Sequence, residues 1–440
     1  MGGLHGFVSV HKKLLIILGI VLFILFGSIV ALLIKKTASN EPLLPNSTQT
    51  FPSPTPIPLS DQKVSLVHST IYYVKIQAGS SEDPPKYSLF TADSTGTTST
   101  NVGEIAGPAK QILPILDGKY LFIGDLGFLE RGNTIYLYDA KTDETKPFLS
   151  ASSGFQIESY LLSPDKSAII IWEQSVGATT DGISQIVHAT LEQIEKKRVL
   201  LSENVGDQTK YPLFWSRATG KIYLDSYSVS KNGKSRGIFE LSTNGNIRPV
   251  RGLAVDEYSA SPILSPRGDT IAYTAFNAQT GVKIPSPNVP NGLLRESIRN
   301  PNQLKVYNLI TEEMETLLDN TQGTLFDSLI FDKDGRNLIY RTLKITSASQ
   351  TVPQEYRKIN LATRNNELFA KNVNGIFLTQ FANNDMLFGT RSQIIDSIGN
   401  LSSGSFGQIL SGVYLYSPFS QTYSKILTDD PIQIFSIENQ

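Results

Sequence analysis

The chain has 440 residues, with 39 basic and 40 acidic side chains and no cysteine. The absence of cysteine excludes disulfide frameworks, thiolate zinc sites, cysteine nucleophiles and a lipid-modified N-terminal cysteine. The near-zero net charge argues against a nucleic-acid-binding surface, which normally leaves a basic excess, and the mean hydropathy of -0.10 argues against a multi-span membrane protein.

An uninterrupted apolar run at residues 14–34 predicts one membrane-spanning helix. The run contains no charge and no proline, and at about 1.5 Å per residue it reaches roughly 30 Å, the thickness of a hydrocarbon core. A cleaved secretory signal is the alternative, but its apolar region is usually shorter and ends at a small-residue cleavage site. Lys35 and Lys36 follow the run instead, so we expect an uncleaved signal anchor.

Residues 35–60 are expected to form a linker rich in proline, serine and threonine. Such a tract cannot bury a core and favours extended backbone, which makes it a semi-rigid spacer. Lysines on both sides of the apolar run balance each other, so the positive-inside bias is weak. Because spacers that hold a domain away from a membrane are commonest outside the cell, we expect residues 1–13 to be a short cytoplasmic tail. The protein would then be a single-pass cell-membrane protein with an extracytoplasmic C-terminal domain.

Residues 61–440 predict an all-β domain built from a repeat. Short runs of apolar and aromatic residues alternate with turn clusters, and no long stretch shows helical periodicity. A strongly apolar strand recurs about every 50 residues, the period of four-stranded propeller blades. The first apolar positions of these strands are Ile71, Leu121, Ile169, Ile222, Ile271, Leu338 and Met386. The sequence therefore predicts a seven-bladed β-propeller of four-stranded blades.

The segment at residues 432–437 is also expected to be a strand. A propeller usually closes its ring by completing one blade with strands from both ends of the chain. The first unit has no turn-type segment before its apolar strand, so we expect residues 432–437 to pair into the first blade. A simple C-terminal tail is the alternative.

Three units carry a resemblance to a known family. They read S-P-D-K-S-A-I-I-I-W from Ser163, S-P-R-G-D-T-I-A-Y from Ser265 and D-K-D-G-R-N-L-I-Y from Asp332. They resemble the S-P-D-G-x-x-I-A-Y repeat of the WD40-like (TolB-type) propellers, which also occurs in prolyl oligopeptidase-type enzymes. The likeness extends from about Val64 to Gln440, although the other units match in pattern alone. It implies the propeller fold and says little about activity, because propellers host many unrelated functions.

Searches for catalytic motifs give no candidate. The sequence holds no G-x-S-x-G nucleophile elbow, no G-x-x-x-x-G-K-[ST] phosphate loop and no H-E-x-x-H pair. The predicted domain has only two histidines, His68 and His188, which are far apart in sequence. We therefore expect no catalytic residue, no cofactor and no metal ligand, and both histidines are predicted to be ordinary strand or loop residues.

Other polar and aromatic residues are expected to be structural. Calcium prefers clustered oxygen ligands, but the turn aspartates belong to different units and lack calcium-loop spacing, so we expect them to form and cap turns. These aspartates are Asp165, Asp269, Asp332 and Asp334. Trp172 and Trp215 are expected to pack between blades rather than to form a carbohydrate platform.

The longest predicted loop, between Phe276 and Gln303, holds the candidate interaction element. In a propeller the loops between second and third strands open on one face, where insertions commonly form binding surfaces. The candidate interaction residues, a short amphipathic set, are Leu293, Leu294, Arg295, Glu296 and Arg299. A loop that is disordered or that only packs against the ring is the alternative. Shorter loops of the same kind are expected at residues 175–184 and 345–354.

The features together predict a membrane-anchored extracytoplasmic β-propeller that serves as a protein-interaction or scaffold module in the cell envelope. Its partner on the loop face would be a protein or an envelope polymer, and nucleic acid is not expected. The alternative is a propeller enzyme that acts on an envelope glycan or peptide at the central channel. A cluster of carboxylates, or of arginine and tyrosine, with perturbed pKa values in the channel mouth would favour the enzyme.

Overall fold

The computed structural model describes most of the repeat region. The described residues are 69–77, 86–94, 98–105, 109–116, 118–124, 133–177, 182–205, 209–227, 237–250, 259–275, 302–319, 324–347, 350–371, 375–381, 384–391, 409–427 and 432–439. The predicted span at residues 14–34, the linker at 35–60 and the candidate interaction residues of the long loop lie outside them. Within these residues no helix has the length and apolar character needed to cross a bilayer.

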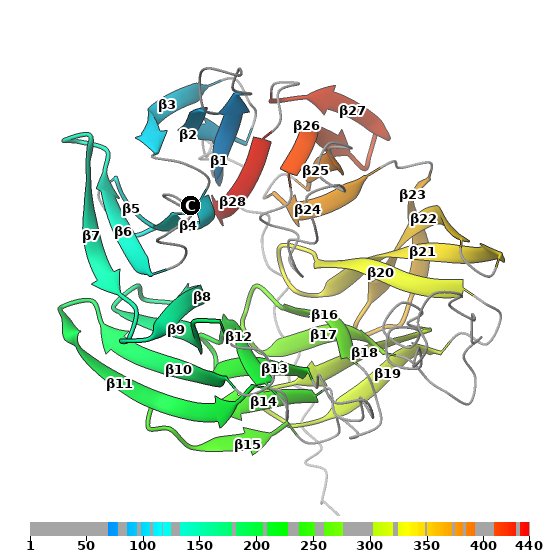
Figure 1. Ribbon diagram of the computed structural model, residues 1–440. Helices are drawn as coiled ribbons and strands as arrows, with labels where there is room; N and C mark the ends of the chain where they lie inside the picture. The colour runs from blue at the N-terminus through cyan, green and yellow to red at the C-terminus, as the bar shows by residue number, and fades with distance from the viewer. Residues whose placement is uncertain are drawn as a thin grey trace, which may run out of the picture. The chain divides into compact units, whose positions relative to one another are not determined.

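The described strands form seven four-stranded antiparallel blades arranged in a ring (Figure 1). Blades 1 to 3, from the inner strand outward, consist of β28 (Ile432–Asn439), β1 (Ser69–Gln77), β2 (Lys86–Asp93) and β3 (Ser99–Ile105); β4 (Ala109–Pro114), β5 (Lys119–Gly124), β6 (Thr134–Asp139) and β7 (Glu144–Ser150); and β8 (Phe155–Leu162), β9 (Ala168–Ser175), β10 (Ile183–Thr190) and β11 (Gln193–Asn204).

The remaining blades follow the same order. Blades 4 and 5 consist of β12 (Thr209–Trp215), β13 (Ile222–Tyr227), β14 (Gly237–Leu241) and β15 (Ile247–Pro249), and of β16 (Ser259–Leu264), β17 (Thr270–Ala275), β18 (Gln303–Asn308) and β19 (Met314–Asp319). Blades 6 and 7 consist of β20 (Thr324–Phe331), β21 (Asn337–Ser347), β22 (Gln350–Asn360) and β23 (Asn366–Lys371), and of β24 (Ile376–Gln380), β25 (Met386–Arg391), β26 (Ile409–Ser417) and β27 (Thr422–Lys425).

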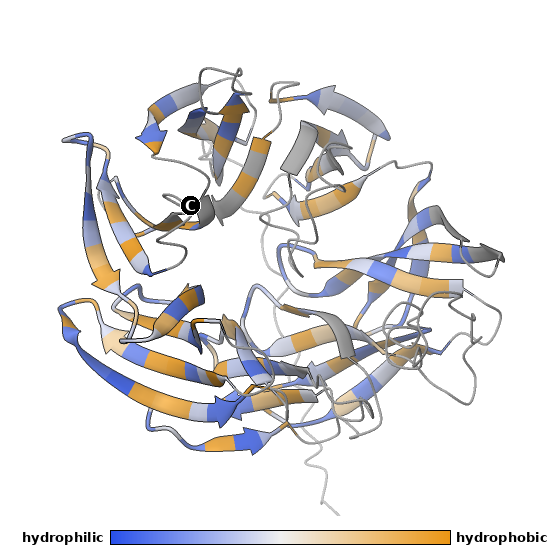
Figure 2. Cartoon of the chain, viewed as in Figure 1, coloured by the Kyte–Doolittle hydropathy of each residue, from blue (hydrophilic) through white to orange (hydrophobic). Residues whose placement is uncertain are grey.

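The seven apolar strands predicted from the sequence are the second strands of the seven blades, which confirms the predicted architecture. These strands lie between two neighbours in their own sheet and face adjacent blades on both sides, so their sequences are nearly continuous apolar runs. The outer strands carry hydrophilic residues among their hydrophobic ones (Figure 2). The described core residues fall into seven clusters, one at each junction between neighbouring blades.

The C-terminal strand closes the ring, as predicted. β28 pairs with β1 along its length, from Ser69 opposite Asn439 to Lys75 opposite Ile432. The start of β28 also pairs with β26 through Leu410 opposite Ile432. Blades 7 and 1 therefore share one hydrogen-bonded sheet. The strand extends two residues beyond the predicted end at residue 437.

One predicted loop is a hairpin. The segment 345–354 was expected to be a loop between a second and a third strand, but β21 and β22 stay paired as far as Ser347 opposite Gln350. Threonine, valine and isoleucine in this segment favour extended backbone, and pairing satisfies its backbone hydrogen-bonding groups.

The antiparallel topology divides the connections between two faces of the ring. Hairpins between the first and second strands and between the third and fourth strands open on one face, which we call the turn face. Connections between the second and third strands and between successive blades open on the opposite face, which we call the loop face. Most of the residues outside the described set belong to loop-face connections.

A buried hydroxyl or carboxylate caps several first hairpins of the turn face. The Ser163 hydroxyl accepts hydrogen bonds from the backbone N–H groups four and five residues later, at 3.0 and 2.9 Å. Ser265 accepts the equivalent pair at 3.2 and 3.1 Å, and the Asp332 carboxylate accepts them at 2.8 and 3.1 Å. These turn roles confirm the structural expectation for Asp332. Asp165 and Asp269 also act within their turns, where they accept hydrogen bonds from Ser163 and Ser265.

The second hairpins of blades 2, 5, 6 and 7 share another turn. Each begins with an aspartate, asparagine or serine, and the residue four positions later has a positive φ of 54–62°. The asparagine side chain of Asn308 accepts hydrogen bonds from Ile310 and Thr311, and the equivalent asparagine in blade 6 does the same. The left-handed residues are Asp143, Glu312, Arg364 and Gln421. This turn directs the left-handed residue outward from the blade.

Candidate binding groove on the turn face

A groove of about 460 Å³ lies between blades 5 and 6 on the turn face. Both hairpins of each blade contribute to it. Its lining residues are Arg267, Thr270, Val306, Asn308, Glu313, Glu315, Gly335, Arg336, Asn360, Leu361, Ala362 and Arg364. The volume is in the range of small-ligand sites and is sufficient for a few side chains of a partner.

The floor of the groove is the contact between two first hairpins. Gly335 has a φ of +66°, which favours glycine, and a Cβ built there would lie 3.5 Å from Cδ of Pro266 and 3.6 Å from Cβ of Ser265. The blade 6 turn therefore packs closely against the blade 5 turn. This packing fixes Arg267 and Arg336 on the two sides of the contact.

The blade 5 wall is the turn that starts at Asn308. The Oδ1 atom of Asn308 accepts hydrogen bonds from the N–H groups of Ile310 and Thr311 at 2.8 and 3.0 Å, which leaves its amide donors unused among the described residues. Glu313 and Glu315 are exposed along the same wall.

The blade 6 wall carries the left-handed residue Arg364, with a φ of 62°. Its guanidinium crosses the junction and forms an ion pair with Glu315 of blade 5. Both side chains are more than a third exposed, so this pair contributes little to stability and mainly orients the two side chains.

The remaining two arginines differ in their partners. The Nε atom of Arg267 lies 3.1 Å from Oδ2 of Asp269 within its own turn. Arg336 is exposed, and no described residue forms a hydrogen bond or an ion pair with its guanidinium. Arg336 is therefore the lining cation whose charge is available to a ligand.

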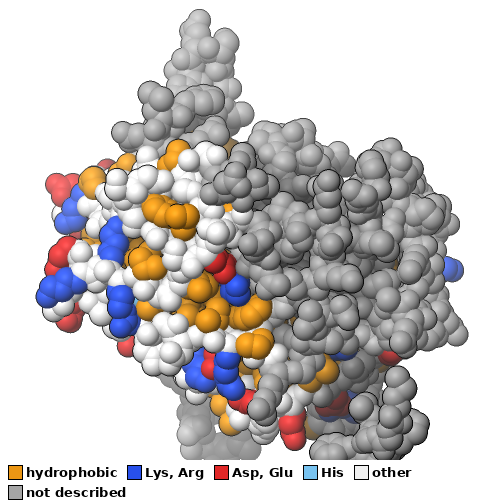
Figure 3. Space-filling view, turned by 60° about the horizontal axis from the view of Figure 1, so that its bottom comes forward, with side chains coloured by type: hydrophobic (Ala, Val, Ile, Leu, Met, Phe, Trp, Pro, Cys, Tyr) orange, Lys and Arg blue, Asp and Glu red, His pale blue; other side chains and the backbone are white. Residues whose placement is uncertain are grey.

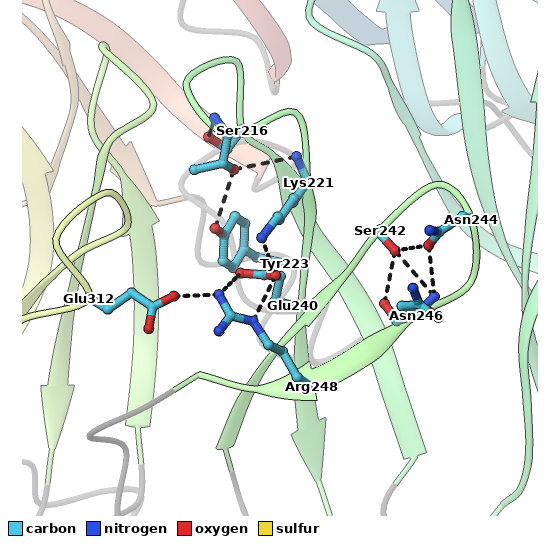
Figure 4. Close-up of polar contacts among 10 residues, drawn as sticks. Ser216, Lys221, Tyr223, Glu240, Ser242, Asn244, Asn246, Arg248 and Glu312 are labelled. Atoms are coloured by element: carbon cyan, nitrogen blue, oxygen red, sulfur yellow. Dashed lines mark hydrogen bonds and ion pairs between the residues drawn. The ribbon is translucent and has the colours of Figure 1, made fainter.

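A charged cluster at the junction of blades 4 and 5 adjoins the groove (Figure 4). Arg248 of β15 lies between Glu240 of β14 and Glu312, the left-handed residue of the blade 5 turn. Its Nε and Nη2 atoms lie 2.9 and 3.1 Å from the Glu240 carboxylate oxygens, and Nη2 lies 2.5 Å from Oε1 of Glu312. Lys221 forms a second ion pair with Glu240.

The electrostatics of this cluster hold Glu240 ionised. Burial alone would raise the pKa of its carboxyl, but hydrogen bonds from Arg248 and Lys221 outweigh burial and leave the pKa below its usual value. Hydrogen bonds to Glu240 and, to a lesser extent, to Glu312 raise the pKa of Arg248. A carboxyl with a lowered pKa is a poor general acid, so the cluster joins two blades and gives no sign of proton transfer.

One described face of the molecule is mixed in charge. The coloured part of Figure 3 shows basic and acidic side chains next to each other around exposed apolar ones, with no broad patch of one sign. This pattern agrees with the balanced composition of the chain. Phosphate-tracking surfaces for nucleic acid carry a basic stripe instead.

The cluster closest to the predicted signature of an enzyme lies between blades 6 and 7. Arg341 forms a bidentate pair with Asp327, at 2.8 and 2.6 Å, and donates to the carbonyl of Gly375 at 3.1 Å. The Tyr356 hydroxyl donates to the same carbonyl, and burial raises its pKa to about 12. The Arg341–Asp327 pair lies within blade 6, and the two hydrogen bonds to the Gly375 carbonyl join this blade to blade 7. The contacts of this cluster therefore hold the blade and its junction together.

The predicted aromatic and histidine roles can be checked at the junction of blades 3 and 4. Trp172 of blade 3 packs on Tyr211 of blade 4 with ring centroids 5.6 Å apart, and His188 of blade 3 meets Trp215 of blade 4 edge-on. These contacts confirm packing between blades for both tryptophans. Burial, aided by Arg198, lowers the pKa of His188, which keeps it neutral at pH 7. His68 lies outside the described residues.

The structure and the sequence analysis place candidate sites on different faces. Leu293, Leu294, Arg295, Glu296 and Arg299 lie outside the described residues, so their predicted role stays a prediction. The sequence analysis missed the turn-face groove. A signal was present in two hairpins, N-L-I-T-E from Asn308 and N-L-A-T-R from Asn360. Both sequences form the same turn, and the last residue of each, which has the positive φ, is acidic in one and basic in the other. Among the described residues no group of three or more potential ligands could hold a metal ion.

Comparisons with known proteins identify the fold. No protein-family model matches the sequence, and no curated protein matches it. A solved oligogalacturonate lyase from Vibrio parahaemolyticus is 10% identical with a TM-score of 0.50, covering 83% of this chain and 91% of that chain. Puromycin hydrolase is 9% identical with a TM-score of 0.53, covering 82% of this chain and 52% of that chain, so this chain matches about half of its length.

A TolB protein from Acinetobacter baumannii is also similar. It is 17% identical, with 68% of this chain and 62% of that chain covered, but its TM-score of 0.39 is too low to carry an argument. The likeness to the other two proteins extends to the fold alone at such low identities. The propeller implied by the sequence repeat is thus confirmed as a fold, and function must be argued from this chain's own residues.

Proposed function

We propose that the protein is a membrane-anchored, extracytoplasmic β-propeller that binds a protein partner as a scaffold in the cell envelope. The observation that carries the proposal is the turn-face groove, where two blades bring together three arginines, two glutamates and unused amide donors. Such a set can recognise a ligand by hydrogen bonds and charge.

The titratable groups of the described blades support a binding role. The carboxyls with resolved shifts, Asp165 and Glu240, have lowered pKa values. Hydrogen bonds from Ser163 and Ser167 lower the pKa of Asp165 to about 2. Acid and base catalysis near neutral pH instead needs a carboxyl with a raised pKa or a histidine near its usual range.

The anchor and the orientation are proposed on the sequence. Residues 14–34 form an apolar run long enough to span a bilayer, and the proline-rich linker would hold the propeller away from the membrane surface. Alkaline carbonate extraction of native membranes tests the anchor, and protease digestion of intact cells tests the side on which the propeller lies. Release by carbonate, or protection from the protease, would contradict this part of the proposal.

The loop-face residues at 293–299 form the second proposed contact. Arg295, Glu296 and Arg299, next to Leu293 and Leu294, would supply charge and apolar surface on the face opposite the groove. A scaffold with a contact on each face could hold two partners, or one partner at two places.

The experiment that tests the scaffold function is chemical cross-linking in native membranes followed by affinity capture of the full-length protein. We compare the wild type with Arg336→Glu, which changes the groove, and with a double variant, Arg295→Glu with Arg299→Glu, which changes the loop. A discrete partner that is captured with the wild type and lost with at least one variant supports the proposal. If nothing discrete is captured while the protein degrades an envelope glycan or peptide library, the enzyme alternative replaces it.

A further inference from the structure

We propose that the turn-face groove binds an acidic side chain carried by a partly apolar segment of a partner polypeptide, with Arg336 as its main anchor. This inference rests on the proposed scaffold function and specifies the class of ligand. Four observations carry it: the unused donors in the groove, its own carboxylates, the apolar residues of one wall and the fixed position of Arg336.

The unused donors call for an acceptor. Asn308 accepts two backbone hydrogen bonds through Oδ1, and its amide N–H groups have no partner among the described residues. The guanidinium of Arg336 has five N–H donors and is likewise unpartnered there. A carboxylate accepts two parallel hydrogen bonds from a guanidinium, which makes it the ligand group that best fits an unpaired arginine.

The carboxylates of the groove restrict the kind of anion. Glu313 and Glu315 line the same groove as the three arginines, so its basic side chains outnumber its acidic ones by only one. A polymer with a charge on every unit, such as a polyphosphate, a nucleic acid or a heavily sulfated glycan, would place anions against these glutamates. A polypeptide with one carboxylate and neutral neighbours avoids that repulsion.

One wall of the groove carries apolar residues. Leu361 and Ala362 of blade 6 line the groove, and Ala362 is exposed. Exposed apolar surface beside a polar lining suits a ligand with apolar residues beside its charge. A peptide segment offers that combination, whereas a uniformly charged or uniformly hydroxylated polymer does not.

The backbone around Arg336 is fixed although its side chain is free. Its N–H donates to the Asp332 carboxylate at 2.8 Å and its carbonyl accepts from Leu361 at 2.9 Å. Asp332 is buried, and Gly335 packs against the neighbouring turn. Arg336 therefore lies in a well-fixed turn, which reduces the entropy lost on binding. Replacement of its exposed side chain should leave the fold intact.

The test uses the full-length protein in lipid nanodiscs and fluorescent 12-residue peptides. One set carries a single aspartate or glutamate flanked by leucine, isoleucine or phenylalanine, a matched set carries the corresponding amide, and the third class of probe consists of polyglutamate and heparin. Dissociation constants are measured by fluorescence anisotropy. The variants are Arg336→Gln, Arg336→Lys and a control, Lys141→Gln, which removes one exposed charge on the blade 2 turn of the same face.

We expect acidic–apolar peptides to bind, and the matched amides to bind at least tenfold more weakly. Arg336→Gln should weaken the binding of the acidic peptides about tenfold, and Arg336→Lys should weaken it less. Lys141→Gln should leave their binding unchanged. The proposal is overturned if no acidic–apolar peptide binds, or if the Arg336→Gln variant binds these peptides as tightly as the wild type does. It is also overturned if polyglutamate or heparin binds the wild type as tightly as the acidic–apolar peptides do. Should membrane cross-linking still capture a partner with Arg336→Glu, the scaffold function stands and only the groove assignment fails.

Discussion

At the scale of single residues, the left-handed position of the second hairpin decides which side chains reach the preceding blade. Glu312 of blade 5 meets Arg248 of blade 4, and Arg364 of blade 6 meets Glu315 of blade 5. Asp143 of blade 2 belongs to the same pattern, because it lies beside blade 1 next to Gly103. One local turn, repeated in several blades, therefore supplies ion pairs and packing between neighbours.

Gly103 provides the first prediction at this scale. A Cβ at this position would lie 1.7 Å from the hydroxyl oxygen of Tyr138, whose side chain is buried and bonded to the Val102 carbonyl. Gly103→Ala should lower the free energy of unfolding by about 2–4 kcal/mol, because the ring or the strand must move. The measurement is urea denaturation followed by fluorescence.

Gly154→Ala is the matched control for this substitution. Gly154 has a positive φ of 81°, but no atom lies within 4 Å of a Cβ built there. Gly154→Ala should therefore cost only the backbone strain, about 1–2 kcal/mol. An equal loss in the two variants would show that the contact with Tyr138 is not tight.

Glu240 provides a pH prediction. Because its pKa is below the ordinary value of 4.5, the folded carboxyl binds a proton less tightly than the unfolded one. Its stabilising effect is therefore complete above about pH 4.5 and is lost as the pH falls through the lower, folded value. Glu240→Gln should destabilise the protein by about 1–3 kcal/mol at pH 7, because it leaves Arg248 and Lys221 poorly paired.

The measurement is the difference in unfolding free energy between wild type and Glu240→Gln at pH 7, 5 and 3. This difference should shrink at the lowest pH. A difference that stays constant across the series would mean that the carboxylate charge does not stabilise the junction.

At the scale of elements, the ring is closed by β28, which pairs with β1 and, at its start, with β26. Ile432 and Ile434 of this strand are buried in the cluster shared by blades 7 and 1. Ile434→Ala should therefore destabilise the protein by about 2–4 kcal/mol through lost burial and a cavity. Ile310→Ala is the matched control, since Ile310 is 61% exposed and should change stability by less than about 0.5 kcal/mol.

Thermal unfolding followed by circular dichroism distinguishes these two isoleucine variants. Ile434→Ala should lower the midpoint clearly and Ile310→Ala should leave it near that of the wild type. Equal midpoints for Ile434→Ala and wild type would mean that β28 is not required for ring closure.

The elements were predictable because their signals are local. The second strands are strongly apolar and recur about every 50 residues, and several of the turns before them contain Ser-Pro or Asp-Gly sequences, so periodicity and turn chemistry together located the blades. The hairpin at 345–354 was wrongly predicted to be a loop because its serine, proline and glutamine residues are typical of loops, although its isoleucine, valine and threonines favour extended backbone. The strand that closes the ring was found because the first unit lacks an inner strand.

The groove could not be predicted because its residues meet only when the ring forms. Arg364 and Glu315 are 49 residues apart in sequence, and Arg248 and Glu312 are 64 apart. Which charged residue faces the neighbouring blade depends on the left-handed turn, which the shared N-L-x-T sequence marks, and on the register between blades, which no local sequence marks. The free guanidinium of Arg336 is also a property of its surroundings and not of its sequence.

At the scale of the whole molecule, the ring is a rigid platform whose two faces differ. The turn face consists of short, capped hairpins that pack on one another, and it carries the groove. The loop face receives the longer connections between second and third strands, where the sequence analysis predicts the interaction residues near Leu294. A platform of this kind separates the task of folding, which the apolar junctions perform, from the task of binding, which the surface turns and loops perform.

Site-specific photo-cross-linking in living cells tests the central claim, that this platform binds a protein, most directly. A photoreactive amino acid is placed at Ala362 on the wall of the groove, at Leu294 in the long loop and, as a control, at Val199, a half-exposed residue of the outer strand β11. The account predicts a discrete protein adduct at Ala362 that disappears with Arg336→Glu, and none at Val199. The absence of any discrete protein adduct at both Ala362 and Leu294 would contradict it.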